Sequence, residues 1–564
     1  MSDPQQYEVR EPMPGVVYAP REELRRYVDA GLLTRESMAD AFRASFRRHA
    51  HRVALASREG EFTYAALDET TDRLAAAWLE MGLKPLDRVV FQIGNCAELV
   101  LGFIACLKAG LIPVCTLAAH REQEIGYLGQ HAAARMHFVQ GDDPKFDDIA
   151  FAERIREQAP TLKWLVQARG ERRGSALHLK EQVESMPLAQ ARQVLAGVRI
   201  DPFQVAVFQL SGGTTGVPKI IPRFHNEYIY NMRAFAQFAG YTEHDCLFMP
   251  MPMMHNLNMG CCFGPFLLTG GTVAMATALT PEALGDVFRQ YEPTWTAIAG
   301  PIVEKLKPAI QSGALPLKRL RGVISANNAP ALRALLKAPV RHIFGMTEGV
   351  IMLTSEDDPQ IVQDTMVGRP ISPMDQVKLF QPGTEIEITE EGVAGECAFA
   401  GPYTIHGYYD APERNAQAFT SQGFYRSGDL MLFRDIGGNR YYQFCGRTKD
   451  VVDRAGEKVN SEEVELLVAR HPAVVAAAVV GMPDRVYGER VCAFVTLREG
   501  HAAPTVAELG TFLAEQGLAK FKWPERIEVL AEMPLTNAGK LSKPTLKKLI
   551  ADKLAAEQAP QPTT

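Results

Sequence analysis

The stretch "SGGTTGVPK", residues 211–219, follows the apolar run "QVAVFQL" and contains few large side chains. A backbone rich in Gly, Ser and Thr can turn successive N–H groups into one concavity, which binds phosphate without a dedicated charge. Hydroxyl donors and one cation flank this backbone, at Ser211, Thr214, Thr215 and Lys219. The stretch therefore predicts a phosphate-binding loop after a strand, and the alternative is a tight connection between two elements.

The loop differs from the Walker A pattern, G-x-x-x-x-G-K-[ST]. Val217 and Pro218 separate its last glycine from the lysine. P-loop kinases and GTPases are therefore disfavoured, and other motifs must decide what the loop holds.

The length and net charge of the chain limit the number of domains and the kinds of partner that it can have. With 564 residues the chain exceeds the roughly 250 to 300 at which a single core stops growing, so we expect two or three domains. Hydrophobic residues make up 46% and charged residues 22%, as in ordinary globular proteins. A formal charge of −6 argues against nucleic acid or an anionic membrane as the main partner.

No targeting or membrane segment is predicted. The start, "MSDPQQYEVREP", lacks the basic and apolar parts of a secretory signal, so we expect a cytoplasmic protein. The apolar run 96–119 contains Glu98, Lys108 and Pro113, whereas a membrane span needs about 20 mainly apolar residues. We interpret this run as a buried helix and a strand. The nine cysteines include no C-x-x-C pair, so we expect reduced, buried thiols.

The pattern of apolar residues predicts an α/β protein. Between about 60 and 300, helical stretches such as "LDETTDRLAAAWLEMG" alternate with short apolar runs such as "DRVVFQI" and "RMHFVQ", which indicates parallel sheets covered by helices. Residues 376–445 change to short strands and Gly-rich turns, and a compact mixed unit follows. A helix after Asn460 has Glu463 three positions on, a capping-box pattern.

We therefore predict a large N-terminal domain, 1–449, of two parallel-type α/β subdomains plus a β-rich subdomain. A small, mobile α+β domain, 450–554, and a disordered tail, 555–564, should follow.

Five ordered motifs carry a resemblance to a known family: "LSGGTTGVPK", "FGMTEG" (344–349), "YRSGDL" (425–430), "GRTKDVVDRAGEKVNSEEVE" (446–465) and "PLTNAGKLSK" (534–543). Together they resemble the acyl-adenylate-forming superfamily, which includes acyl-CoA synthetases, peptide-synthetase adenylation domains and luciferases. The resemblance runs from about residue 45 to 550. It implies a ligase that converts a carboxylate and Mg-ATP into acyl-AMP and pyrophosphate, after which a thiol displaces AMP.

The resemblance also implies roles for individual residues. The ATP-binding positions are Ser211, Gly212, Gly213, Thr214, Thr215, Gly216, Lys219, Asp429 and Arg447. Thr347 and Glu348 match the pair that meets the α-phosphate and Mg²⁺, a hard cation that prefers oxygen ligands. Asp429 would bind the ribose hydroxyls, and Arg447 would make a second nucleotide contact near the ribose. Taken alone, Asp429 could be a turn residue and Arg447 a surface cation.

In the C-terminal region, Lys540 matches the lysine that bridges the carboxylate and the α-phosphate. On composition alone it could belong to a solvated basic face. Asp450 matches the hinge between the large and small domains, so we expect the small domain to alternate between two half-reactions. Ala455 stands where many members of the aryl branch have glycine, which makes close approach of a pantetheine arm less certain.

The flank "KIIPRFHNEYIYNMRAF" and the later "PMMHNLNMG" most resemble 2,3-dihydroxybenzoate and salicylate AMP ligases of siderophore pathways. The resemblance places Asn226, Tyr228, Asn231, His255, Asn327 and Asn328 at the acid. It also implies that His255 is a catalytic residue, together with Thr347, Glu348 and Lys540. Asn226 could instead be an N-cap, His255 a core or capping residue, and the asparagine pair a turn. Where dihydroxybenzoate enzymes typically have serine, Asn231 leaves less room beside a second hydroxyl, which favours salicylate.

The predicted function is thus an aryl-acid AMP ligase that loads the phosphopantetheine of a separate aryl carrier protein. An aryl-CoA ligase of aromatic breakdown shares the adenylation half and stays open, as does a hydroxy- or amino-substituted heteroaryl acid. No carrier segment is recognisable in the 24 residues after Lys540, so we expect the thiol acceptor to be a separate molecule. The expected partners include neither nucleic acid nor membrane.

Overall fold

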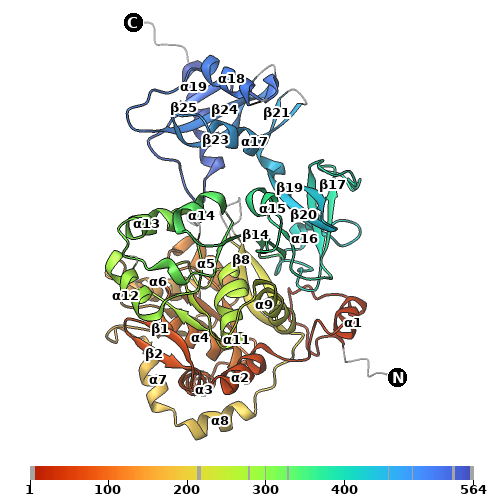
Figure 1. Cartoon of the computed structure of the whole chain (residues 1–564). Coiled ribbons are helices and arrows are strands. Elements are labelled where there is room, and N and C mark those ends of the chain that lie inside the picture. Colours follow the sequence, from red (N-terminus) through yellow and green to blue (C-terminus); the bar gives the residue numbers. More distant parts are fainter. Residues whose placement is uncertain are drawn as a thin grey trace. The chain divides into compact units, whose positions relative to one another are not determined.

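The computed structural model describes residues 7–211, 218–276, 278, 280–298, 300–326, 329–454, 457–484, 487–516, 518–536 and 540–558 (Figure 1). The chain divides into two compact units, residues 1–376 with 399–425, and residues 377–398 with 426–564. The predicted boundary at 449/450 lies inside the second unit, and its use as a hinge stays a prediction.

The first unit contains two large sheets, each mainly parallel with antiparallel edges. One has the order β7(Leu177–His178)-β6(Trp164–Gln167)-β5(Met136–Val139)-β3(Arg88–Gln92)-β4(Ile112–Val114)-β8(Val205–Ser211)-β9(Lys219–Phe224). The other has the order β16(Arg369–Pro370)-β15(Gly349–Leu353)-β14(Val340–Met346)-β13(Gly322–Ser325)-β12(Trp295–Ala297)-β10(Cys246–Phe248)-β11(Thr272–Ala274)-β1(Val53–Ser57)-β2(Gly60–Thr63). The predicted pair of parallel-type subdomains is confirmed.

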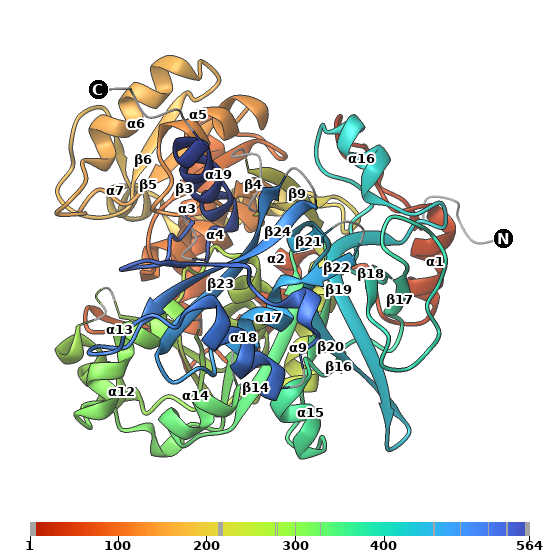
Figure 2. The same cartoon turned by 90° about the horizontal axis from the view of Figure 1, so that it is seen from above.

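The first unit also contains helices and short helical turns. They are α1(Arg21–Asp29), α2(Met38–Arg48), α3(Tyr64–Glu80), α4(Ala97–Ala109), α5(Glu122–His131), α6(Asp148–Gln158), α7(Leu179–Ser185), α8(Leu188–Ala196), α9(His225–Ala239), α10(Asn256–Asn258), a π-helix at Met259–Phe263, α11(Gly264–Thr269), α12(Pro281–Tyr291), α13(Gly300–Gln311), a 3₁₀ turn at Leu317–Arg319, α14(Ala329–Leu336), α15(Gln360–Thr365) and α16(Pro412–Ala418). Figure 2 shows α5 and α6 near β3, β5 and β6; α5 contacts β3, and α6 contacts β5 and β6.

Helix α4 explains the apolar run that the sequence places at 96–119. It contacts β4 of one sheet and β1 of the other, and every residue from Leu99 to Ala109 is buried. A helix that is apolar on all sides fits such a position between layers. The predicted buried helix and strand are confirmed, and no described helix is long and apolar enough to cross a membrane.

The second unit is smaller and carries two sheets. Its four-stranded sheet has the order β17(Gln376–Phe380)-β18(Gly395–Ala400)-β19(Tyr425–Ile436)-β20(Asn439–Arg447). Its five-stranded sheet has the order β22(Glu457–Asn460)-β21(Val451–Arg454)-β24(Gly488–Leu497)-β23(Val474–Asp484), with β25(Arg526–Val529) beside β24. The helices are α17(Ser461–Val468), α18(Val506–Glu515) and α19(Lys543–Gln558), with 3₁₀ turns at Thr448–Asp450 and Lys520–Lys522.

The strands of this five-stranded sheet alternate between two small cores. Val479 and Val491 face a cluster that includes residues of α17 and α18. Their neighbours Val480 and Cys492 face another cluster, with Leu546 and Ile550 of α19. The period-2 alternation of a strand thus buries both faces of one sheet.

The start of α17 differs in detail from the prediction. Asn460 caps the helix, since its Oδ1 accepts from the Glu462 backbone N at 3.0 Å. Glu463, however, binds Lys522, with Nζ 2.6 Å from Oε2. The helix start is confirmed, whereas the capping box is wrong because a lysine distant in sequence takes the carboxylate.

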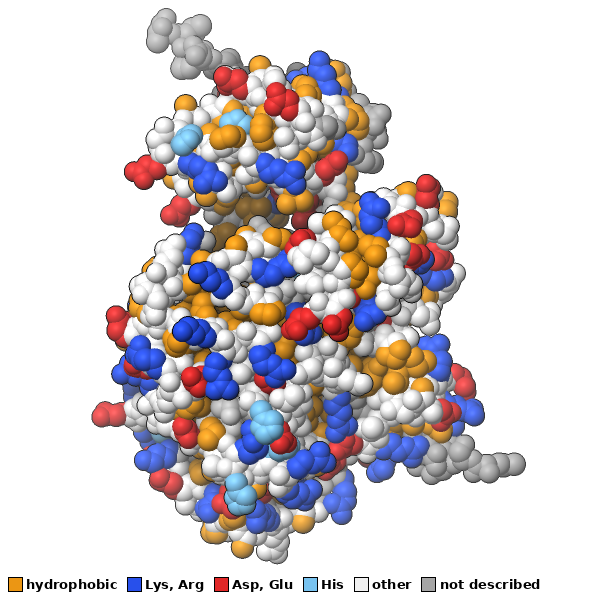
Figure 3. All heavy atoms as spheres, in the orientation of Figure 1, with side chains coloured by type: hydrophobic (Ala, Val, Ile, Leu, Met, Phe, Trp, Pro, Cys, Tyr) orange, Lys and Arg blue, Asp and Glu red, His pale blue; other side chains and the backbone are white. Residues whose placement is uncertain are grey.

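The nine cysteines are free thiols; eight are buried and Cys445 is partly buried, as predicted. On the face shown in Figure 3, acidic and basic side chains are interspersed, in keeping with the small formal charge of −6.

Candidate active site

The Gly-rich loop connects two antiparallel strands. Ser211, the last residue of β8, pairs with Lys219, the first residue of β9. Gly212, Gly213, Thr214, Thr215 and Gly216 lie outside the described residues, so their predicted roles rest on the sequence. The buried Ser211 hydroxyl has no hydrogen-bond partner among the described residues. Such an unsatisfied hydroxyl fits a ligand with acceptor oxygens, such as a phosphate.

Thr347 and Glu348 form the turn between β14 and β15, in which Met346 pairs with Gly349. Both are nearly buried, at 8% and 6% exposure. The Glu348 Oε1 accepts from the Tyr408 hydroxyl at 2.8 Å. The turn therefore holds a fixed carboxylate, where the sequence predicts a Mg²⁺ ligand.

Tyr408 joins this carboxylate to the loop and is a residue that the sequence analysis missed. Its hydroxyl lies 2.8 Å from the Tyr425 hydroxyl and accepts from Lys219 Nζ at 3.4 Å. The Lys219 Nζ also lies 4.7 Å from the centre of the Tyr408 ring, a cation–π distance. Burial and the nearby Glu348 carboxylate raise the Tyr408 pKa, so its hydroxyl stays protonated and can donate. The aromatic pair at 408–409 was the only sequence sign of this role.

A cluster of buried polar side chains surrounds Asn256, next to this turn; we call it the Asn256 cluster. The Asn256 Oδ1 accepts from the Tyr228 hydroxyl at 2.7 Å and from Arg223 Nη1 at 3.2 Å. Gln209 on β8 donates to the Tyr228 hydroxyl at 3.3 Å. Tyr228 is thus placed with other polar side chains, as the acid-site prediction requires. The sequence analysis missed Asn256, although it adjoins the predicted His255.

His255 itself is exposed and begins α10. Its Nδ1 accepts from the Leu257 backbone N at 3.3 Å, so the side chain acts as the N-cap of this short helix. The structure therefore shows the capping role that the sequence left open for His255. Its predicted contact with the acid stays a prediction.

Asn226 lies on a different face of α9 from Tyr228, because residues two apart on a helix do not face each other. It lines a small cavity with Tyr27, Phe203 and Thr404. The Asn226 amide nitrogen and the Thr404 hydroxyl are buried without partners among the described residues. Phe224, not Asn226, is the N-cap of α9. The structure therefore does not place Asn226 in the Asn256 cluster. The alternative role of Asn226 as an N-cap is wrong.

Asn231 is buried, and both ends of its amide are bound within the protein. Its Nδ2 donates to the Gly260 carbonyl at 3.1 Å and its Oδ1 accepts from Arg223 at 3.4 Å. Asn327 and Asn328 lie outside the described residues. Their predicted contact with the acid therefore rests on the sequence alone.

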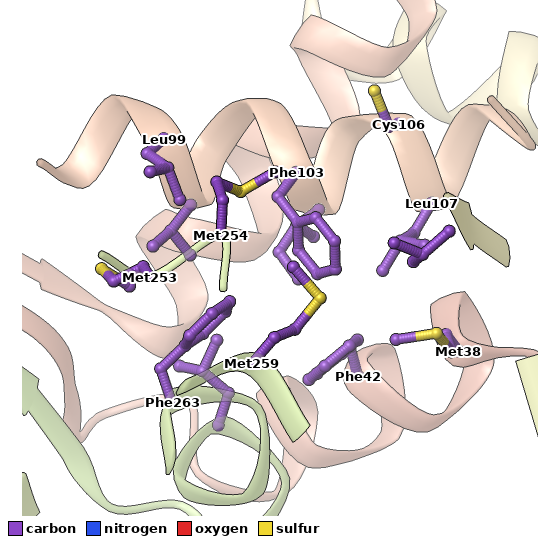
Figure 4. Packing of buried hydrophobic residues seen from close by; sticks show 14 of the residues in the cluster. Met38, Phe42, Leu99, Phe103, Cys106, Leu107, Met253, Met254, Met259 and Phe263 are labelled. Atoms are coloured by element: carbon purple, nitrogen blue, oxygen red, sulfur yellow. The ribbon is translucent and has the colours of Figure 1, made fainter. Parts of the chain in front are cut away.

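An apolar, methionine-rich wall supports the segment that carries Asn256. Figure 4 shows Met259 and Phe263 of the π-helix converging with Phe103 of α4. The Phe103 and Phe263 ring centres lie 6.0 Å apart at 80°. A Cβ at Gly264, just after the π-helix, would lie 2.4 Å from the Met259 carbonyl oxygen, so only glycine fits there. π-helices often occur at functional sites.

"YRSGDL" lies on β19, and the first two residues of "GRTKD" end the neighbouring strand β20. Asp429 pairs with Arg447 across the hairpin, and Arg447 Nε lies 3.1 Å from Asp429 Oδ1. Asp429 is 4% exposed. The structure thus brings together the two residues that the sequence assigns to the ribose.

Lys540 and Asp450 lie in turns of the second unit. Lys540 is exposed, and its backbone N donates to the Thr536 hydroxyl at 3.2 Å. The Thr536 backbone N donates to the Lys540 carbonyl at 2.6 Å. Asp450 ends a 3₁₀ turn, and its carbonyl accepts from the Ser461 hydroxyl. Ala455 lies outside the described residues.

Glu462, at the start of α17, gives a pH-dependent prediction. Burial, and then the nearby Glu465, raise the Glu462 pKa from 4.5 to about 7. The folded protein therefore holds this proton more tightly than the unfolded chain, and its stability should fall as the pH rises from about 4.5 to 7. We expect Glu462→Gln to raise the free energy of unfolding by about 1 kcal/mol at pH 8 and to change it little at pH 4.

Thermal unfolding at both pH values checks this expectation. The matched control is Glu463→Gln, which removes a carboxylate bound to Lys522 and should not stabilise the protein. A Glu462→Gln variant that is no more stable than the wild type at pH 8 would contradict the prediction.

Comparisons with known proteins agree with this geometry. Residues 42–409 match the AMP-binding enzyme family, and residues 463–540 match the AMP-binding enzyme C-terminal domain. Pyochelin synthase PchD of Pseudomonas aeruginosa is 37% identical, over 94% of this chain and 96% of its own. The 2,3-dihydroxybenzoate-AMP ligase of Bacillus subtilis is 34% identical, over 95% of this chain and 98% of its own. The apo structure of Mycobacterium smegmatis MbtA is 30% identical with a TM-score of 0.70, covering 95% of this chain and 98% of that one.

The chain therefore belongs to the AMP-binding enzyme family. It is an ATP-dependent, adenylate-forming ligase, as the resemblance predicted. The described residues contain no group of three His, Cys, Asp or Glu side chains that could hold a metal ion by itself. Mg²⁺ is usually bound through one or two carboxylates together with substrate phosphates, so Glu348 fits such a site.

Proposed function

We propose that this protein activates a hydroxybenzoate-type acid, salicylate or 2,3-dihydroxybenzoate. A carboxylate oxygen of the acid attacks the α-phosphorus of ATP, and pyrophosphate leaves. A phosphopantetheine thiol of an aryl carrier protein then attacks the acyl carbon, and AMP leaves. The name of one relative described above, a 2,3-dihydroxybenzoate-AMP ligase, supports this choice of acid.

The observation that carries the acid class is the buried polar pair Tyr228 and Asn256 beside an apolar wall. Tyr228 is fully buried and Asn256 is 6% exposed. The Tyr228 hydroxyl and the Asn256 oxygen are already bonded to each other, so the N–H donors of the Asn256 amide are the groups left to bind a substrate. A ring with a polar substituent would pair with such groups, whereas a plain aliphatic acid would not.

The adenylation step needs positive charge and fixed donors, because negative charge shifts between oxygens as pyrophosphate leaves. We assign this role to Lys219, the Ser211 hydroxyl and Lys540. When bound, Mg²⁺ would neutralise phosphate charge, and Glu348 would hold it. The hydrogen bond from Tyr408 fixes the Glu348 carboxylate in its turn.

Pyrophosphate exchange tests this function. The purified protein, with ATP and Mg²⁺, is given salicylate, 2,3-dihydroxybenzoate, benzoate, pyridine carboxylates and an aliphatic acid. We expect exchange to be greatest with a hydroxybenzoate. Greatest exchange with the aliphatic acid would overturn the aryl assignment. Thioester formation is then compared with carrier protein and with CoA, and faster transfer to CoA would identify the aryl-CoA ligase alternative instead.

A further inference from the structure

We propose that Arg223 is a positioning residue for acid recognition: it fixes the Asn256 amide and ties it to the backbone of Thr347. This inference rests on the proposed function, in which the acid binds beside Asn256. Arg223 lies on β9, four residues after Lys219. The family resemblance gives Arg223 no role, and its contacts are evident only in the folded chain.

All five N–H donors of Arg223 have an acceptor. Nε and Nη2 donate to the two carboxylate oxygens of Glu227, each at 2.8 Å. Nη1 donates to Asn256 Oδ1 at 3.2 Å and to the Thr347 carbonyl at 3.1 Å. The remaining Nη2 hydrogen points to Asn231 Oδ1 at 3.4 Å. A planar guanidinium offers five donors in one rigid fork, so no other side chain could replace this set.

The arginine is held in place before any substrate binds. Its side chain is 1% exposed, and that of Glu227 is 10% exposed. The guanidinium carbon lies 4.3 Å from the centre of the Tyr228 ring, a second, cation–π contact. Glu227 and Tyr228 both belong to α9, so the fork has a fixed orientation relative to this helix.

This fixed fork decides which end of the Asn256 amide faces its surroundings. Arg223 and the Tyr228 hydroxyl both donate to the same oxygen, Asn256 Oδ1. A flipped amide would place its NH₂ group against the Arg223 N–H, which can only donate, so this hydrogen bond would be lost. Asn256 must therefore present its N–H donors on the other side, and it discriminates for an acceptor oxygen on the acid.

The Arg223 guanidinium also contacts the turn that carries Glu348 and, through Asn231, the π-helix. Thr347, whose carbonyl it binds, precedes the predicted metal ligand Glu348. Asn231, which it also binds, holds the Gly260 carbonyl of the π-helix. A displaced Arg223 guanidinium would therefore disturb both the Asn256 amide and the turn that carries Glu348. The structure assigns to Arg223 the coupling between recognition of the ring substituent and adenylation.

The test compares Arg223→Lys with a matched control, Lys108→Met. Lys108 is also buried in the first unit and binds two carboxylates, with Nζ 2.5 Å from Asp68 and 2.7 Å from Asp72. It lies outside the proposed site. For each protein we measure thermal unfolding and the ratio of kcat/KM for salicylate over benzoate in pyrophosphate exchange. Benzoate lacks the hydroxyl that the Asn256 amide would recognise.

We expect Arg223→Lys to lower this ratio about tenfold, the effect of one hydrogen bond that is no longer aligned. We expect Lys108→Met to unfold at a lower temperature with an unchanged ratio. In an Asn256→Ala background, Arg223→Lys should lower the ratio no further, because Arg223 acts through that amide. A ratio that is unchanged in Arg223→Lys would overturn the proposal and leave the arginine a purely structural role.

If Arg223→Lys does not fold, Glu227→Gln replaces it. This variant keeps the shape of the anchor but weakens its hold on the fork, and it should lower the ratio several-fold. An unchanged ratio in Glu227→Gln would equally overturn the proposal. Wild-type protein that exchanges pyrophosphate with none of benzoate, salicylate and 2,3-dihydroxybenzoate would overturn the proposed function itself, before any variant is compared.

Discussion

Lys540→Ala is expected to slow adenylation about 100- to 1000-fold, as removal of a group that stabilises transition-state charge does in other enzymes. The second half-reaction, transfer from added aryl-AMP to the thiol, should change only a few-fold. The reason is that the proposed ammonium contact is needed only while carboxylate and phosphate join. Pyrophosphate exchange measures the first step, and thioester formation from purified aryl-AMP measures the second.

The neighbourhood of Lys540 supplies a matched control. Lys543 is a poor control, because its partly buried side chain is bound to Glu465, with Nζ 2.7 Å from Oε1. Lys548 is exposed on α19 and pairs with Asp552 at 2.6 Å. Lys548→Ala should therefore leave both half-reactions unchanged. Equal losses in the two half-reactions of Lys540→Ala would show that the lysine does not act in adenylation.

Glu348→Gln is expected to lower pyrophosphate exchange about 100-fold at ordinary Mg²⁺ concentrations, because a neutral amide is a poor ligand for a hard cation. The fold should be retained, since the amide oxygen can still accept from the Tyr408 hydroxyl. A titration with Mg²⁺ distinguishes the causes: the variant should need more Mg²⁺ for half-maximal exchange. A loss that does not depend on Mg²⁺ would contradict the predicted role as metal ligand.

Two further variants sharpen this experiment. Tyr408→Phe removes the hydrogen bond to Glu348 but keeps the charge, so we expect a smaller loss, about tenfold. Glu356→Gln is the control, because Glu356 is an exposed carboxylate of the same unit that pairs with Arg341 at 3.0 Å. It should not change the Mg²⁺ requirement.

Much of the fold could be predicted from local patterns. The apolar run that became α4 and β4 reflects burial that the sequence shows directly. The alternation of helical stretches with short apolar runs likewise indicated the parallel sheets. The five motifs also located the turn with Glu348 and the Asp429–Arg447 pair. These residues lie in short motifs, and the order of the motifs along the chain indicates the family.

The contacts of Arg223 and Tyr408 could not be predicted in this way. Arg223 binds Asn256, 33 residues away, and Thr347, 124 residues away. Tyr408 binds Glu348, 60 residues away. Such contacts depend on how sheets and loops meet, which no local periodicity records. For Asn226 only the N-cap alternative was wrong, because α9 begins at His225 with Phe224 as its cap. Its predicted contact with the acid stays a prediction.

The burial of the thiols has a consequence for the fate of the activated acid. A mixed anhydride of an acid and AMP acylates accessible thiolates, so an exposed cysteine of the enzyme would compete with the intended acceptor. Eight of the nine cysteines are buried, and burial raises the pKa of the ninth, Cys445, to about 11. At neutral pH the protein therefore offers its own product almost no sulfur nucleophile, which protects it from self-acylation during slow turnover.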